Sequence, residues 1–401
     1  MHDLAAEFDL ELLDFTKDDP SLAPWVAHVG GRRLGEAEVL EGFAPLAERI
    51  DEAFETLADP EGAVTYADPN RGEFLDRQSI RQWLDFVECS GPVRELIEVA
   101  YLTEYGMETD VQSALNLLML ISTETERLEI FGESDERYRF RDGNDVVVRK
   151  LAASLDPGQV VLGSKLVKLG LGSDGRVSMV FQGDGGTEEV SADHAVLAIP
   201  FTLLRQVELD LDLAPAKRRG IEKLGYGTNA KLMVGFGERV WRGQGSNGEV
   251  FTDLPFQCSW ETSRLQPGAA GIITNFTGGR QGVAVGKGPA RDRTADFLAG
   301  FDRVFPGAKA AWSGEAVRMH WPSHPWVQGS YAGYLVGQWT TICGSEGERV
   351  GNVHFAGEHT SLDFQGFMEG GALTGAMAAL EVAADLGIRG RPRVQDAAEL
   401  S

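Results

Sequence analysis

A glycine-rich segment near the end of the chain carries the strongest chemical signal. Residues 353–356 predict a short strand, Gly357-Glu358 a turn, and residues 367–386 an alanine-rich helix that Gly387 is placed to end. This arrangement suits a flavin or a nucleotide, because the free N–H groups and the dipole at a helix N-terminus favour negative charge. The alternative is a glycine-rich helix that simply packs on a sheet. The residues alone leave both interpretations open.

A second glycine pattern is more easily interpreted. Residues 170–175 read Gly-Leu-Gly-Ser-Asp-Gly and match the GxGxxG dinucleotide fingerprint. That fingerprint needs a strand before it and a helix after it. Residues 176–181 alternate instead like another strand, so we predict a hairpin turn. No other segment offers a cradle for a pyrophosphate.

Lys231 is a further candidate, because it stands in the apolar strand pattern Ala230–Phe236. Burying a lysine without a partner is costly, which favours a functional role. The alternative is a lysine that extends from a strand end to solvent. His320, His324 and His359 have no cysteine or carboxylate at metal-site spacing, so no metal site is predicted. The chain also has no Gly-x-Ser-x-Gly motif, which leaves hydrolase chemistry without support.

The elements that must position these residues change in character along the chain. Residues 1–136 are predicted to be mostly helical, and later residues mix helices with strands. The predicted helices cover residues 40–54, 79–102 with Ser79 as N-cap, 113–121 and 146–155. The predicted strands cover residues 160–162, 166–169, 177–181, 194–199, 230–236 and 270–277. Residues 195–199 are continuously apolar, which predicts a strand buried on both faces.

Composition limits the class of protein. The 401 residues are 43% hydrophobic, carry a net charge of -24 and include three widely spaced cysteines. The negative charge argues against a nucleic-acid partner. It could steer cationic substrates, although solubility is the simpler explanation. There is no long apolar run and no basic leader, so we expect a cytoplasmic protein without a membrane span.

The segment 355–361, Phe-Ala-Gly-Glu-His-Thr-Ser, continues with Phe364 to Gly370 and resembles the C-terminal signature of the flavin monoamine oxidases. That family includes L-amino-acid oxidases and polyamine oxidases. Segments 139–152, 160–169, 192–200 and 321–331 agree with it in order and spacing. The resemblance implies an α/β and α+β fold with interleaved domains. The substrate domain would comprise 1–136 and 220–328, the partial FAD-binding domain 137–219 and 329–390, and a flexible tail 391–401.

The resemblance also implies the site. Lys231 matches the lysine that holds a water against flavin N5. Tyr331 and Phe367 match the two aromatic residues that flank the substrate amine, although many members carry tyrosine where Phe367 stands. The implied cofactor contacts are Leu166, Trp321, Ser330, Gly357, Glu358, Phe367 and Met368. Ser330 cannot form the thioether that some members make through cysteine, so the FAD is expected to be non-covalent.

The implied activity is FAD-dependent oxidation of an amine or an L-amino acid to the imine, with formation of hydrogen peroxide. Residues 4–8 resemble the family chain just after its glycine motif. We therefore expect an FAD domain that is incomplete at its N-terminus and a small second polypeptide that supplies the glycine-rich segment. The alternative is a non-catalytic remnant or a binding protein on an oxidase scaffold. Arg205 and Arg280 are candidates, by residue type alone, for binding a substrate carboxylate.

Overall fold

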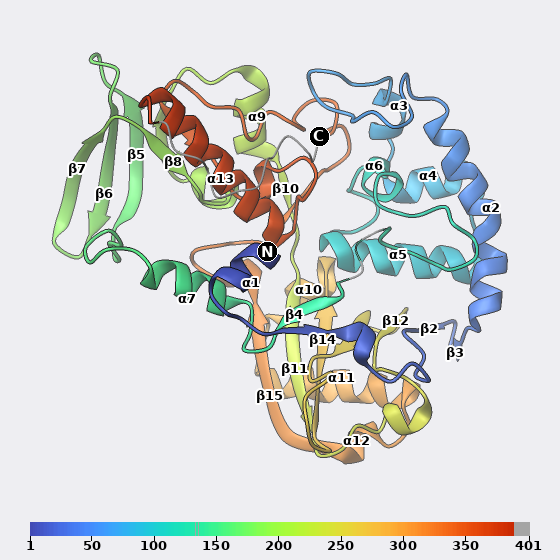
Figure 1. Cartoon of the computed structure of the whole chain (residues 1–401). Helices are drawn as coiled ribbons and strands as arrows, with labels where there is room; N and C mark the ends of the chain where they lie inside the picture. Colours follow the sequence, from blue (N-terminus) through green and yellow to red (C-terminus); the bar gives the residue numbers. More distant parts are fainter. Residues whose placement is uncertain (133, 135, 389–401) are drawn as a thin grey trace.

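The computed structural model describes residues 1–132, 134 and 136–388; the predicted tail at 391–401 lies outside them. Figure 1 shows two groups of elements that share long connections. One group surrounds a seven-stranded sheet, and the other surrounds the C-terminal helix. No described helix has the length and apolar character that a membrane crossing requires.

The seven-stranded sheet has the order β15-β11-β14-β13-β12-β2-β3, and only the β12–β2 pair is parallel. Its strands are β2 (Val26–Val29), β3 (Arg32–Arg33), β11 (Ala230–Phe236), β12 (Val250–Thr252), β13 (Cys258–Glu261), β14 (Gly271–Thr277) and β15 (Trp312–His320). Alternate residues of β11 are buried, as a half-buried strand requires. Val234 and Phe236 pack with Phe301 of α11 (Ala290–Val304). The strands predicted near 230–236 and 270–277 are confirmed.

Helices cover the opposite face of this sheet. They are α2 (Glu36–Phe54), α3 (Glu73–Asp76), α4 (Ile80–Phe86), α5 (Gly91–Tyr105) and α6 (Ala114–Leu118). Ser79 is the predicted N-cap, and it forms a capping box with Gln82. The single helix predicted over 79–102 is wrong, because the chain breaks at Glu88, whose φ is +57°, and restarts at Gly91-Pro92. The helix predicted over 113–121 is shorter than expected.

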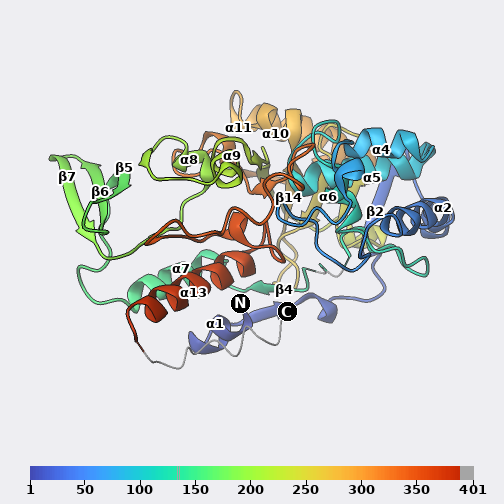
Figure 2. The ribbon, with the colours of Figure 1, turned by 90° about the horizontal axis from the view of Figure 1, so that it is seen from above.

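The second group contains two sheets. β8 (Ala195–Leu197) and β17 (Val353–Phe355) form a parallel pair. The four-stranded sheet consists of β5 (Lys165–Leu171), β6 (Val177–Gly183), β7 (Gly186–Ala192) and β9 (Glu208–Asp210). Gly172 N donates to Arg176 O (2.8 Å) in the tight turn between β5 and β6, so the GxGxxG match is the predicted hairpin. Figure 2 shows α13 (Met368–Asp385) and α7 (Asp145–Ala153) at the same end of the molecule as β5, β6 and β7.

Two predictions about strands near this group are wrong. Residues 160–162 form no strand, and Val160, Val161 and Leu162 are 47%, 71% and 86% exposed. No neighbouring strand pairs with them within the described chain. β8 is not buried on both faces, because Val196 is 43% exposed. Only Leu197 of this strand is buried, against the core around Phe355.

The first residues of the chain lie with the second group. α1 (His2–Glu7) packs Ala5 against Phe140 and Val147, and β1 (Leu12–Asp14) pairs with β4 (Tyr138–Phe140). Residues 1–14 therefore contact the segment 138–147 rather than the helices of the predicted substrate domain. The rest of the domain division stays a prediction. The remaining helices and strands are α8 (Phe201–Leu204), α9 (Pro215–Lys223), α10 (Gly279–Val285), α12 (Ala308–Ala311), β10 (Gly225–Tyr226) and β16 (Ala332–Gly333).

Candidate active site

Ser330 and Tyr331 lie against the start of β11. Gly227 N donates to Tyr331 O (2.9 Å), and Ser330 N donates to Gly227 O (2.8 Å). The Ser330 hydroxyl also donates to Asn229 Oδ1 (2.5 Å). These bonds fix the loop that precedes β16 beside the residues that lead into Lys231. Segments about a hundred residues apart in the sequence thus meet at one place.

Glu358 holds two further segments together. Its Oε1 accepts from Ala332 N (3.1 Å), and its Oε2 accepts from Gly366 N (2.7 Å). Burial raises the pKa of Glu358, while these two hydrogen bonds oppose the rise. The carboxyl group therefore connects the Tyr331 loop to the turn before Phe367. In this chain Glu358 is a positioning residue, and its predicted contact with the cofactor stays a prediction.

Gly366 lies against the Tyr331 ring and directly precedes Phe367. Its φ is +87°, a left-handed conformation that glycine adopts without strain. A Cβ at this position would lie 3.6 Å from the Tyr331 ring. Phe367 is the next residue and the N-cap of α13. The two predicted aromatic residues thus flank one glycine.

Gly357 lies where β17 passes into the 3-10 turn Glu358–Thr360. Its φ is +128°, and a Cβ would lie only 2.7 Å from the His359 ring, so glycine is required. Its N–H donates to Thr374 Oγ1 of α13 (2.9 Å). A Cβ at Gly375, the next residue of α13, would meet nothing within 4 Å. The start of α13, including Met368, which is 44% exposed, leaves room for a cofactor.

Lys231 lies on β11 directly opposite Phe276 of β14 and Met319 of β15. Its Nζ lies 5.3 Å from the Trp260 ring centroid and 5.5 Å from that of Phe276. Burial lowers the pKa of Lys231, and the negative charge of Glu136 partly opposes this. An aromatic-lined lysine with a lowered pKa can exchange a proton more readily than an exposed one.

Tyr331 and Trp321 extend this site. The Tyr331 hydroxyl donates to the backbone oxygen of Glu104, and burial holds its pKa well above 10, so the phenol stays neutral. Trp321 begins a 3-10 turn directly after His320, which pairs with Ala230 at the start of β11. Leu166 lies further away, on β5, where it packs on the core that includes Phe355.

Two buried side-chain nitrogens in the segment 357–367 bear on whether a flavin fits this site. Gln365 Nε2 and His359 Nε2 have no hydrogen-bond partner in the described part of the chain. Buried polar atoms are almost always satisfied, so an unpaired donor beside the start of α13 indicates a missing acceptor. A flavin carries carbonyl and ring-nitrogen acceptors, and the residues therefore fit this cofactor. Gln365 was not predicted as a site residue, although it stands inside the recognised motif.

The two arginines suggested by residue type are otherwise engaged. Arg205 donates to the backbone oxygens of Ile221 (2.7 Å) and Leu224 (2.6 Å). Arg280 is 77% exposed at its side chain and pairs with Glu108 (2.9 Å). Neither is free to bind a substrate carboxylate in this arrangement.

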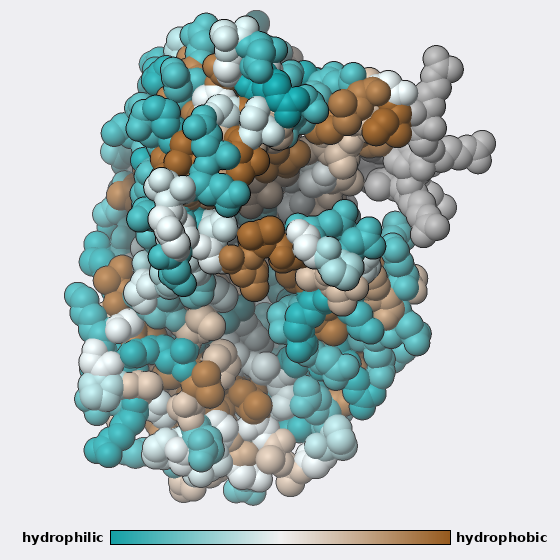
Figure 3. Space-filling model, turned by 90° about the vertical axis from the view of Figure 1, so that its left-hand side faces the viewer, coloured by the Kyte–Doolittle hydropathy of each residue, from teal (hydrophilic) through white to brown (hydrophobic). Residues whose placement is uncertain are grey.

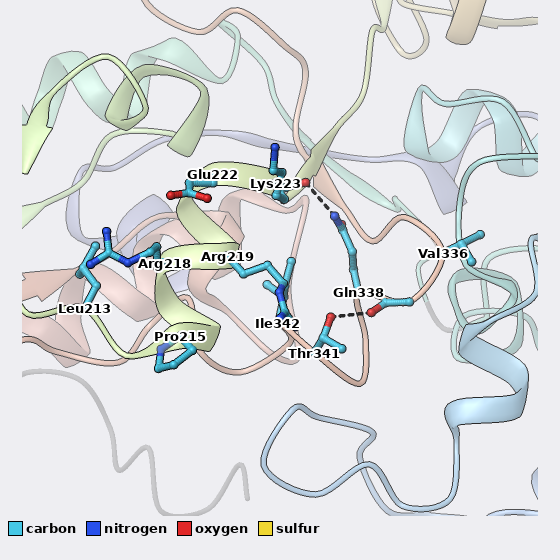
Figure 4. Close-up of a pocket in the computed structure, with 11 residues that line it drawn as sticks. Leu213, Pro215, Arg218, Arg219, Glu222, Lys223, Val336, Gln338, Thr341 and Ile342 are labelled. Atoms are coloured by element: carbon cyan, nitrogen blue, oxygen red, sulfur yellow. Dashed lines mark hydrogen bonds between the residues drawn. The ribbon is translucent and has the colours of Figure 1, made fainter.

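A surface pocket of about 660 Å³ lies beside α9. Figure 4 shows its basic residues Arg218, Arg219 and Lys223 on α9, with Arg218 pointing away from Gln338, whose Nε2 donates to Lys223 O (2.7 Å). None of the predicted site residues lines this pocket. The structure therefore separates it from the group around Tyr331.

His194, His354 and Asp385 lie close enough to share a metal ion, which the sequence pattern did not indicate. His354 Nδ1 is 2.6 Å from Glu381 Oε2, and its Nε2 is 3.2 Å from His194 Nδ1. Asp385 pairs with Arg349 (2.7 Å). These bonds tie α13 to β8 and β17. His320, His324 and His359, for which no metal site was predicted, are not among these three residues.

Replacing Glu104 by glutamine should make stability less dependent on pH. Burial raises the pKa of Glu104 to about 8, and the charge of Glu136 adds to this. Because the folded pKa exceeds the unfolded value, the stability from the protonated carboxyl is complete below about pH 4.5 and is lost as the pH rises through about 8. Urea unfolding should find Glu104→Gln more stable than the wild type at pH 9, by about 1 kcal/mol or more.

The difference between Glu104→Gln and the wild type should shrink at pH 5, where both side chains are neutral. Glu95→Gln, an exposed position on the same helix, is the matched control. The same stability difference at both pH values would contradict a raised pKa.

Comparison with known families agrees with this geometry. The sequence model of the flavin-containing amine oxidoreductases matches residues 1–383, so the chain belongs to that family. A protein named as a flavin-containing monoamine oxidase in Mycobacterium tuberculosis is 24% identical over 84% of this chain and 72% of its own length. An L-amino acid dehydrogenase of Synechocystis is 25% identical over 62% of this chain. This second match spans about half of that relative, 51% of its length.

Solved structures show the same fold. Putrescine oxidase bound to putrescine matches with a TM-score of 0.77 and 19% identity, over 97% of this chain and 85% of that one. Cyclohexylamine oxidase from Brevibacterium oxydans matches with the same TM-score and identity, over 96% of this chain and 85% of that one. The predicted family and the amine-oxidase-like fold are both confirmed.

Proposed function

We propose that this chain catalyses the FAD-dependent oxidation of an amine or an L-amino acid to the imine, with formation of hydrogen peroxide. One observation carries the proposal. The Glu358 carboxyl group accepts from Ala332 N and Gly366 N, the neighbours of Tyr331 and Phe367, and Ser330 bonds to Asn229, two residues before Lys231. These segments come from three separate parts of the sequence.

The bound flavin would supply the redox chemistry: it would accept a hydride equivalent from the C–H bond next to the amine nitrogen, which loses a proton as the C–N bond becomes C=N, and pass two electrons, with two protons, to oxygen as hydrogen peroxide. The chain would hold FAD without a covalent bond, through the residues around Gly357 and Gln365. Tyr331 and Phe367 would orient the neutral amine between their rings and exclude water. Lys231 would hold a water molecule against flavin N5, as the matching lysine of the family does. The imine that leaves is hydrolysed in solution.

We further propose that a second, small polypeptide supplies the segment that holds the ADP half of FAD. The described residues contain no GxGxxG loop between a strand and a helix. β8 and β17 form a parallel sheet of only two strands, whereas parallel sheets are normally larger and covered on both faces. Val148 of α7 is 67% exposed, and Val161 and Leu162 are 71% and 86% exposed. Figure 3 shows hydrophobic residues around a hollow on the face that includes this region.

Absorbance spectra and a peroxide assay test both proposals. The chain is purified alone, and also after co-expression with the glycine-rich segment of a related oxidase. We expect flavin bands and peroxide from amines only in the co-expressed pair, and release of FAD into the supernatant after acid precipitation. No flavin in either preparation would overturn the enzyme proposal. FAD retained by the chain alone would overturn only the partner proposal.

We also propose that the protein acts in the cytoplasm. Cys89, Cys258 and Cys343 are all free thiols in the structure, and free buried thiols suit a reducing compartment.

A further inference from the structure

The far end of α13 meets the β8–β17 pair at two histidines and an aspartate. His194 directly precedes β8, His354 is the middle residue of β17, and Asp385 is the last residue of α13. One ligand atom from each of the three residues lies within 4.8 Å of the other two. A helix rises about 1.5 Å per residue, so Asp385 stands roughly 25 Å along α13 from Met368. The cluster is therefore separate from the flavin-side end of the helix.

Glu381 fixes the orientation of the His354 ring. His354 Nδ1 lies 2.6 Å from Glu381 Oε2. An ionised carboxylate only accepts hydrogen bonds, so in the neutral ring Nδ1 carries the proton and the lone pair of Nε2 is left for another partner. Metal-bound histidines have this same arrangement, in which one ring nitrogen donates to a carboxylate and the other binds the ion. The His354 side chain is fully buried, which holds the ring in place.

His194 brings a second nitrogen to the free side of the His354 ring. Its Nδ1 lies 3.2 Å from His354 Nε2 and 3.8 Å from Asp385 Oδ2. Two nitrogens that bind one zinc ion at about 2.0–2.1 Å in tetrahedral geometry stand about 3.3 Å apart. Without a metal, the same contact is a hydrogen bond in which His194 Nδ1 donates to His354 Nε2. A bound ion replaces that proton and uses both lone pairs.

Asp385 supplies the charged ligand and the route from solvent. Its side chain is 32% exposed, whereas those of His194 and His354 are 12% and 0% exposed. Arg349 pairs with Asp385 Oδ2 (2.7 Å), and this hydrogen bond lowers the pKa of the Asp385 carboxyl group. Carboxylates that bind metals are commonly hydrogen-bonded in this way. Asp385 and Glu381 together outweigh Arg349, so one negative charge remains to attract a cation.

We propose that His194, His354 and Asp385 bind a zinc ion that fastens the end of α13 to β8 and β17. Imidazole nitrogens favour zinc over magnesium and calcium, which prefer oxygen ligands. Three protein ligands leave the fourth tetrahedral position to a water molecule. The ion joins three segments that are separate in the sequence, so bound zinc stabilises the fold. This proposal goes beyond the proposed function and does not depend on it.

Calorimetric titration with Zn²⁺ tests the site. The full chain is produced without a polyhistidine tag, treated with a chelator and returned to metal-free buffer. One equivalent of Zn²⁺ should bind, and Zn²⁺ at a hundredfold excess over Kd should raise the Tm by about 3–5 °C. Mg²⁺ should do neither. Glu381→Gln should weaken Zn²⁺ binding by about ten- to a hundredfold, because Glu381 only orients a ligand, and His194→Gln and Asp385→Asn should each weaken it further.

Asp193→Asn and His2→Gln are the controls, because both residues are exposed. The first removes a carboxylate next to His194, and the second removes an imidazole elsewhere on the surface. Both should keep the Zn²⁺ affinity of the wild type, and a melting curve of each metal-free variant shows that it is folded. A wild type that binds no Zn²⁺ would overturn the proposal, as would a wild-type affinity in either ligand variant. Equal losses in the controls and the ligand variants would also overturn it.

Discussion

Replacing Lys231 by methionine should lower kcat by about a hundredfold or more, while KM for the amine and the flavin spectrum change little. The magnitude is that expected when a positioned proton-exchanging group is removed. The side chain is buried among Trp260 and Phe276, and burial lowers its pKa. Methionine fills a similar volume and needs no partner, so the fold should be retained. Stopped-flow measurement of flavin reduction checks this result directly.

Lys309→Met is the control, because Lys309 is exposed on α12. It should leave both kinetic parameters unchanged. A Lys231→Met enzyme that keeps activity within threefold of the wild type would show that this lysine only fills space in the sheet. A loss of flavin binding would instead assign it to the cofactor site.

Replacing Glu358 by alanine should remove flavin binding and lower the free energy of unfolding by about 2–5 kcal/mol. The substitution leaves Ala332 N and Gly366 N without acceptors in a desolvated place, and each unsatisfied donor costs about 1–3 kcal/mol. It also releases the two segments that bring Tyr331 and Phe367 together. Urea unfolding and flavin titration of the same preparation measure the two effects.

The Glu358→Gln variant should have a flavin affinity and a free energy of unfolding between those of the wild type and Glu358→Ala. Its amide keeps one oxygen acceptor, but its NH2 group faces the second backbone N–H, and two donors cannot bond to each other. Glu41→Ala, an exposed position on α2, controls for the loss of a glutamate. If Glu358→Ala kept its flavin and its stability, the two hydrogen bonds would have no positioning role.

The local signals in the sequence were strong where a short pattern decides the structure. Residues 170–175 had to form a turn, because the alternating residues that follow cannot continue as a helix. Ser79 began a helix because its hydroxyl and Gln82 satisfy the free N–H groups of the first turn. The same kind of reasoning failed at 79–102, where periodicity continues through a left-handed residue at Glu88. It failed again at 160–162. An apolar run forms a strand only if a neighbouring strand pairs with it, and within the described chain none pairs with these residues.

The sequence by itself determined the family and the glycine turn at 357, because these depend on residue types at short, fixed spacing. Only the tertiary structure decided that Glu358 accepts hydrogen bonds from the backbone of two segments and that Gln365 Nε2 has no partner within the described chain. Those facts depend on how separate segments pack, as where Glu358 bonds to Ala332, 26 residues away. Strand register and helix packing set such contacts, and no local pattern records them.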